Sequence, residues 1–176
     1  MHIIIENSGW LAIFFVWTMV WLPSKIDGQQ KSYKSETGNG SNLLSFIFNA
    51  GMYLAGSLFA IFGFGLIQPL VFWSVVFAIG CLGIMTSSLV TDSRNKKVHS
   101  LGVRVYFIGT TIGGLGIMLT LGDNIGSIII LVRAIGVGYI YLKLKDTGLA
   151  ETWGFSCATI WVSYLYLSQI AQSRLS

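Results

Sequence analysis

The chain has 176 residues, of which 53% are hydrophobic and 10% are charged, and its mean hydropathy is +0.70. Soluble domains carry about 25% charged residues, so this composition excludes an ordinary soluble domain and predicts an all-α membrane protein. The net charge of +4 does not indicate a nucleic-acid partner, because the basic residues lie between apolar runs rather than on one face.

Six apolar runs divide the chain, and a helix needs about 20 residues to cross a bilayer. The runs predict one membrane domain over residues 1–176, a bundle of six transmembrane helices with spans at about 5–22, 43–67, 69–91, 101–121, 125–142 and 152–170. Residues 24–42 are rich in Ser, Gly, Gln and Lys and have little to bury, which predicts a polar loop.

The basic residues gather in alternate loops of this layout, as Lys25, Lys31, Lys34, Arg94, Lys96, Lys97, Lys143 and Lys145. The other side has only Arg174. Cytoplasmic loops carry an excess of Lys and Arg. We therefore expect a cell-membrane protein with the 24–42 loop in the cytoplasm and both termini outside.

Small residues recur four apart within the runs, a spacing that lets helix backbones approach closely. The pairs are Gly51 and Ala55, Gly56 and Ala60, Gly109 and Gly113, and Ala134 and Gly138. Besides the lipid bilayer itself, these glycine-rich faces predict partners in the form of homo- or hetero-oligomers.

Arg133 lies in the middle of the apolar run 125–142. A charged side chain at that depth costs about 2.5–3.5 kcal/mol on insertion scales, so something must stabilise it or use it. At about 1.5 Å per residue, the polar residues at the same depth are Tyr53, Thr110, Thr111, Ser163 and Tyr164. Neither Asp nor Glu is among them.

Three interpretations of Arg133 follow. Hydroxyl and carbonyl oxygens or water can satisfy its donors without neutralising it. Alternatively, it forms an anion site, together with the hydroxyl residues at its depth, for an anionic lipid headgroup or a transported anion. The third interpretation is a carboxylate supplied by a partner subunit.

A second polar cluster lies at the predicted cytoplasmic edge, where Asp92, Arg94, Lys96, Lys97 and His99 follow one another closely. A carboxylate facing an imidazole can perform acid–base chemistry. The simpler interpretation is that Asp92 pairs with a neighbouring base while the basic trio sets topology and attracts anionic headgroups. Neither this cluster nor the two separate cysteines has metal-ligand spacing, so no metal or cofactor is expected.

In one stretch of the sequence, a span ending in small residues is followed by Asp92, a basic stretch, His99 and a glycine-bearing span. This stretch resembles a family of small prokaryotic membrane proteins, domain of unknown function nine-nine-eight. The segment Gly148–Glu151, GLAE, resembles that family's entry to its last helix. Where such proteins usually carry Phe-Pro before the aspartate, this chain has Val90-Thr91. The resemblance implies a six-helix bundle and no established activity.

The sequence leaves three classes of function. The first is a small transport or lipid/anion-binding protein that uses Arg133 inside the bundle. The second is an accessory or structural subunit that packs against membrane partners through its glycine faces. The third is a membrane-embedded enzyme that uses Asp92 and His99, although no catalytic motif accompanies them.

Overall fold

A computed structural model describes residues 2–22, 43–65, 71–145 and 147–175, and all regular structure in these ranges is helical. The helices are α1 (His2–Phe15), which continues into the wider turns of η1 (Val16–Trp21), then α4 (Leu43–Gly65), α5 (Val71–Leu89), α6 (Asp92–Thr120), α7 (Asn124–Tyr139), which continues into η2 (Ile140–Leu144), and α8 (Thr147–Leu175). The all-α prediction is confirmed for this part of the chain. The predicted 24–42 loop lies outside the described residues.

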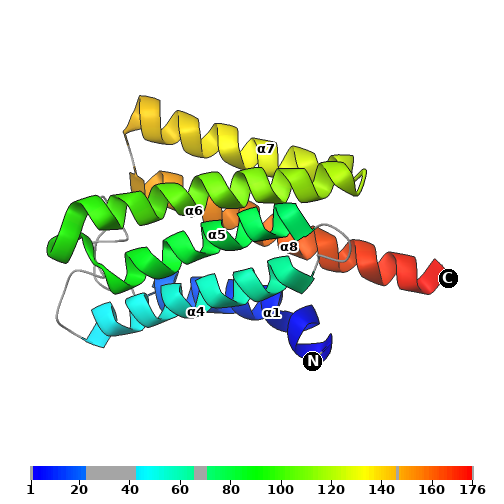
Figure 1. Cartoon of the computed structure of the whole chain (residues 1–176), viewed down its shortest axis with the longest axis horizontal. Helices are drawn as coiled ribbons and strands as arrows, with labels where there is room; N and C mark the ends of the chain where they lie inside the picture. The colour runs from blue at the N-terminus through cyan, green and yellow to red at the C-terminus, as the bar shows by residue number, and fades with distance from the viewer. Residues whose placement is uncertain (1, 23–42, 66–70, 146, 176) are drawn as a thin grey trace.

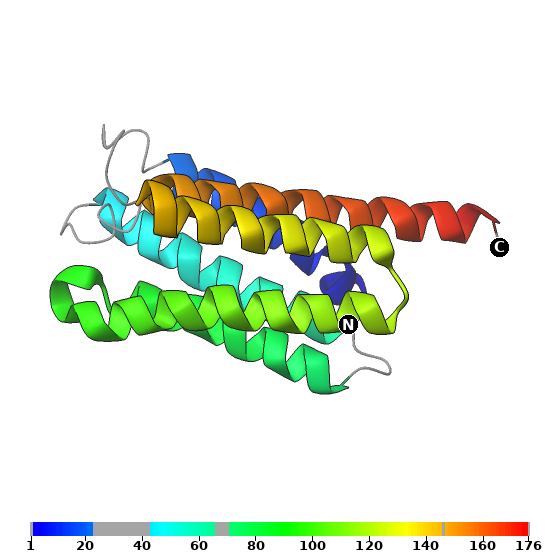
Figure 2. The same cartoon turned by 90° about the horizontal axis from the view of Figure 1, so that it is seen from above.

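The helices run roughly parallel to one long axis and alternate in direction, so that both chain ends lie at the same end of the bundle (Figures 1 and 2). Each helix packs against the next one along the chain from α4 to α8, and α1 packs against α4 and also reaches α8. From α4 to α8, few residues separate one helix from the next along the chain, which favours antiparallel neighbours. The turn between α5 and α6 and the end of η2 lie together at the end opposite the termini (Figure 1).

Four helical stretches in the described ranges are long and apolar enough to cross a membrane: Leu43–Gly65, Phe72–Leu89, Arg94–Thr120 and Asn124–Leu144. Their outward faces carry large apolar side chains, such as Phe46, Phe72, Ile135 and Leu142, each more than two-thirds exposed. Apolar surface on this scale is typical of contact with lipid or with another protein. The fold therefore indicates a membrane protein, in which these four stretches are the candidate membrane spans among the described residues.

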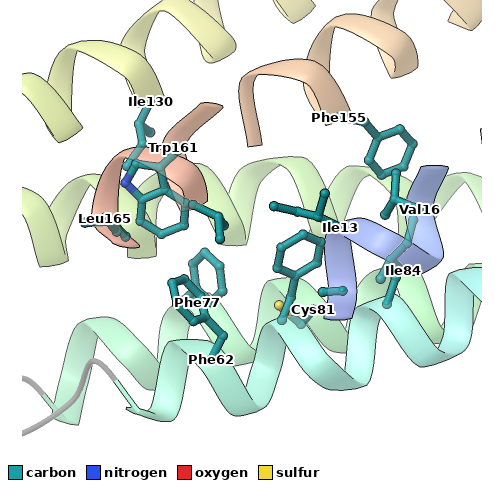
Figure 3. Packing of buried hydrophobic residues seen from close by; sticks show 14 of the residues in the cluster. Ile13, Val16, Phe62, Phe77, Cys81, Ile84, Ile130, Phe155, Trp161 and Leu165 are labelled. Atoms are coloured by element: carbon teal, nitrogen blue, oxygen red, sulfur yellow. The ribbon is translucent and has the colours of Figure 1, made fainter. Parts of the chain in front are cut away.

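The inside of the bundle is filled by aromatic and branched side chains from every helix. Phe62 of α4 lies edge-on to Trp161 of α8, with ring centroids 6.1 Å apart, and Phe77 of α5 lies 5.8 Å from the same indole. Figure 3 shows these rings meeting near Leu165 and Ile130. The cluster therefore joins α8 to the earlier helices through side chains.

Close glycine contacts hold α5 against α6. A Cβ atom built on Gly80 would lie 2.8 Å from the Gly109 carbonyl carbon, and one on Gly113 would lie 2.7 Å from the Phe77 Cα. Real Cβ atoms do not approach so closely, so the two backbones touch only because these positions are glycine. This contact fixes the height of α6 relative to α5, and with it the height of the residues that α6 presents to Arg133.

Residues 92–100, which lie between two predicted spans, are helical apart from one interruption. Asn95 has φ −156° and ψ 93°, and its side-chain oxygen accepts a hydrogen bond from the Val98 N–H at 3.2 Å. Asparagine is a favoured N-cap because its side chain satisfies a free N–H group of the first turn. The long part of α6 therefore starts from Asn95, ahead of the predicted start of the span at residue 101.

Candidate functional site

Arg133 lies on the inward face of α7 and is only 5% exposed. The helix is set in place by Asp123, whose side chain accepts a hydrogen bond from the Gly126 N–H at 2.9 Å and so caps the first turn. Ile130 lies one turn before Arg133 on the same buried face. The guanidinium is therefore directed into the centre of the bundle and not along the lipid surface.

Two neighbouring helices supply hydrogen-bond acceptors to the guanidinium. Its Nη1 donates to the Thr110 Oγ1 at 3.1 Å and to the Thr111 Oγ1 at 3.5 Å, both on α6, while Nε donates to the Gly154 carbonyl of α8 at 3.3 Å. All these acceptors are neutral. Within the described residues no carboxylate forms an ion pair with Arg133, so the positive charge is hydrogen-bonded but not neutralised.

Thr110 is well prepared to accept this bond. Its own hydroxyl donates to the Tyr106 carbonyl one turn earlier, at 2.6 Å. With its single hydrogen committed to the backbone, the Oγ1 atom presents its lone pairs to the arginine. Thr110 therefore acts toward Arg133 as an acceptor of fixed orientation.

Two aromatic rings of α6 flank the charge. The Arg133 Cζ atom lies 5.5 Å from the Tyr106 ring centroid and 5.4 Å from that of Phe107. Both distances are within the range of cation–π attraction, about 6 Å. Because ring faces attract a cation without supplying a counter-charge, they lower the cost of burial and leave the net charge in place.

A cavity in the bundle adjoins the guanidinium. Its walls come from α4, α5, α6, α7 and α8 and are formed by Phe59, Phe77, Tyr106, Thr110, Ile129, Ile130, Arg133, Cys157, Ala158 and Trp161. The space open to the centres of water molecules is about 20 Å³, room for about one or two waters or ions of that size. No Asp or Glu is among these lining residues.

Two of the lining residues have buried donors with no hydrogen-bond partner among the described residues: Arg133 through Nη2 and Trp161 through Nε1. Both residues are 5% exposed. Buried polar groups are nearly always paired, and both groups can donate but cannot accept. The cavity therefore has unused hydrogen-bond donors and a positive charge on its walls, which is the chemistry that binds an anion.

The depth count in the sequence placed five hydroxyl residues near Arg133, and the structure brings Thr110 and Thr111 to it. Tyr53 is 38% exposed on the outer surface of α4. The Tyr164 hydroxyl donates instead to the Asp123 carboxylate at 2.8 Å, and Ser163 is partly buried with no hydrogen bond to Arg133. Equal depth was therefore insufficient, since each helix also has to turn the residue inward.

The edge cluster is arranged differently from an acid–base pair. The His99 Nδ1 lies 3.0 Å from the Ser87 carbonyl oxygen and 3.1 Å from that of Val90, at the end of α5. Because carbonyl oxygens only accept, Nδ1 is the protonated nitrogen, and His99 caps the preceding helix. The side chain of Asp92 lies outside the described residues, so its pairing with His99 stays a prediction.

The three bases of that cluster, Arg94, Lys96 and Lys97, are all exposed at the turn into α6. They lie at the same end of the bundle as Lys143 and Lys145, which are also exposed. This grouping agrees with a role in setting topology and in attracting anionic headgroups.

Three contributors to the Arg133 site were not predicted: the Gly154 carbonyl, the aromatic pair Tyr106 and Phe107, and the Trp161 indole. The aromatic pair precedes the two threonines by four residues, and Trp161 follows Gly154 by seven, so each set shares one helix face. That spacing was available in the sequence. A backbone carbonyl such as that of Gly154 gives no sequence signal.

Most of the small-residue pairs pack within this chain. Gly51 faces Met19 of η1, Gly56 faces Ile84 and Met85 of α5, and Gly109 faces Gly80. By contrast, a Cβ on Gly138 of α7 would meet nothing within 4 Å. Binding of another chain through a glycine-bearing helix face stays a prediction. Among the described residues, Gly138 lies on a helix face that no side chain of this chain covers closely.

Comparisons with protein-family models, with curated proteins and with solved structures found no match. The resemblance to domain of unknown function nine-nine-eight therefore stays a prediction.

Proposed function

We propose that this chain is a small multi-pass protein of the transport or anion-binding class, and that it binds an anion at Arg133 inside the bundle. The observation that carries the proposal is the buried guanidinium, which has three neutral acceptors, no carboxylate among the described residues, and Nη2 unpartnered beside a cavity. Ionisable residues inside membrane segments are rare and characteristically line substrate or ion pathways.

The alternative in which the oxygens alone satisfy Arg133 accounts for Nε and Nη1 but leaves Nη2 without a partner. Leaving a buried charged donor unpaired costs more than about 1–3 kcal/mol. An anion in the cavity would accept from Nη2 and would also offset the buried charge. Either a lipid phosphate or a free anion has this chemistry.

The proposed setting is a prokaryotic cell membrane crossed six times. Four stretches have the length and apolarity of spans, and α1 with η1, together 20 residues, and α8, with 29, lie alongside them in the same bundle. On the positive-inside rule the end that holds Lys97 and Lys143 is cytoplasmic. Both termini would then be outside.

Binding can be tested by thermal unfolding of the purified protein in lipid nanodiscs. The probes are sodium chloride, phosphate and sulfate against sodium gluconate at equal ionic strength, and anionic against zwitterionic lipid. A bound anion should raise the unfolding midpoint in the wild type, and this rise should vanish in Arg133→Gln. Arg104→Gln, which removes an exposed arginine of α6, is the matched control and should keep it.

If no anion and no anionic lipid raises the midpoint in a manner that depends on Arg133, the proposed function is wrong. Orientation is tested separately in cells with a membrane-impermeant thiol reagent. Asn124→Cys, at the exposed start of α7, should be labelled from outside, and Lys97→Cys should not. Labelling of Lys97→Cys from outside would reverse the proposed topology.

A further inference from the structure

We infer that the Arg133 cavity binds a single monatomic anion of the halide class, and that Trp161 is its second hydrogen-bond donor. This inference rests on the proposed anion-binding function and narrows it to one chemical class. It also assigns a binding role to Trp161, which was not among the residues predicted for the site.

The donors come from two helices and lie on one cavity. Arg133 of α7 offers the two N–H bonds of Nη2, and Trp161 of α8 offers the single N–H of its indole. Figure 3 shows the indole nitrogen of Trp161 on the side toward Ile130, which is also a cavity residue. A halide accepts from several donors at once and donates to none, so it matches Nη2 of Arg133 and Nε1 of Trp161, the two unpartnered buried atoms of the lining, which can only donate.

The size of the cavity selects against larger anions. The space open to water-sized centres is about 20 Å³, which admits one or two particles the size of water. A phospholipid headgroup is far larger. A sulfate or phosphate ion presents four oxygens, and three unused N–H bonds cannot satisfy them in a buried site, where each unpaired polar group costs free energy.

The rest of the lining favours a weakly hydrated ion. Phe59, Phe77, Ile129 and Ile130 contribute apolar walls, and the edges of aromatic rings carry partial positive charge. The cost of transferring an ion out of water falls as its radius grows, since the charge is spread over a larger surface. Chloride and bromide are therefore expected to bind more tightly than fluoride.

The inference can be tested by bromide titration of the purified full-length protein in lipid nanodiscs, at constant sodium concentration with gluconate as the replacement anion. Binding is followed by the unfolding midpoint. It is also followed by the line width of the ³⁵Cl nuclear magnetic resonance signal, which narrows as bromide displaces bound chloride from the protein. Trp161→Phe removes the indole donor and keeps one aromatic ring at the position. It is expected to weaken bromide binding by about tenfold or more, as loss of a hydrogen bond to a charged group does.

Trp153→Phe is the matched control, because the Trp153 Nε1 donates to the Val132 carbonyl at 3.4 Å and the residue does not line the cavity. It should bind bromide like the wild type. The line-width measurement is made below the unfolding range, so it reports binding even if Trp161→Phe lowers the midpoint by itself.

The outcomes separate the two proposals. If phosphate, sulfate or anionic lipid binds in a manner that depends on Arg133 while chloride and bromide do not, the halide inference is wrong and the proposed function stands. Bromide binding that is unchanged in Trp161→Phe would remove Trp161 from the site. If nothing binds in a manner that depends on Arg133, water fills the cavity and both proposals are wrong.

Discussion

Thr110→Val tests whether the neutral acceptors around Arg133 stabilise the buried charge. Valine has almost the same shape as threonine and the same β-branching, and Thr110 is 4% exposed. The substitution therefore removes an acceptor without opening a cavity. It leaves the Arg133 Nη1 with only the longer contact to Thr111, at 3.5 Å.

The expected cost lies between two reference values. A hydrogen bond to a charged group contributes about 1.5–3 kcal/mol in soluble proteins, whereas bonds between membrane helices average about 0.6 kcal/mol with a maximum near 1.7. The bond from Nη1 is 3.1 Å long, and its acceptor is oriented by the Tyr106 carbonyl, so we expect about 1–2 kcal/mol. Thr111→Val should cost about 0.5 kcal/mol or less, because 3.5 Å is at the limit of a hydrogen bond.

The assay is reversible unfolding in mixed micelles with increasing SDS, followed by circular dichroism. A double-mutant cycle with Arg133→Met isolates the pair. In the Arg133→Met background no guanidinium remains to be satisfied, so Thr110→Val should be close to neutral. An equal cost in both backgrounds would refute the argument that Thr110 acts through Arg133.

Three further predictions concern the scaffold and use the same unfolding assay. Gly113→Ala should lower the free energy of unfolding by about 1–3 kcal/mol, because the added methyl group overpacks against α5. Gly138→Ala, in open space, should leave the free energy of unfolding unchanged or raise it by up to about 1 kcal/mol. Equal effects of the two substitutions would contradict the close contact between α5 and α6. Asp123→Ala removes both the N-cap of α7 and the hydrogen bond from Tyr164, so it should lower the free energy of unfolding by about 1 kcal/mol more than Tyr164→Phe does. Equal losses would show that the cap does not stabilise α7. Asn95→Ala removes the side-chain cap at the start of the long part of α6, so it should lower the free energy of unfolding by about 1 kcal/mol. Amide exchange should become faster only in the first turn after Asn95. Unchanged exchange in that turn would contradict the capping role.

The Arg133 site could be predicted in part, and its residues show why. Thr110 and Thr111 could be found because helical rise converts sequence position into depth. Tyr53 and Tyr164 satisfied the same count, yet one points outward and the other bonds to Asp123. Depth is a property of one helix, whereas facing depends on how two helices are rotated about their axes, and packing alone sets that rotation.

The sequence by itself determined the class of protein and the position of its one central charge. Apolar runs of bilayer length require helices, because backbone N–H and C=O groups in lipid must be paired within the segment, and Arg133 stands in the middle of such a run. The tertiary structure decided what surrounds that charge. The glycine contact between α5 and α6 and the aromatic packing under α8 accompany an arrangement in which the Gly154 carbonyl meets the guanidinium and the Trp161 indole lines the cavity beside it. These groups meet only when five helices close around the same space, and no local pattern encodes that closure.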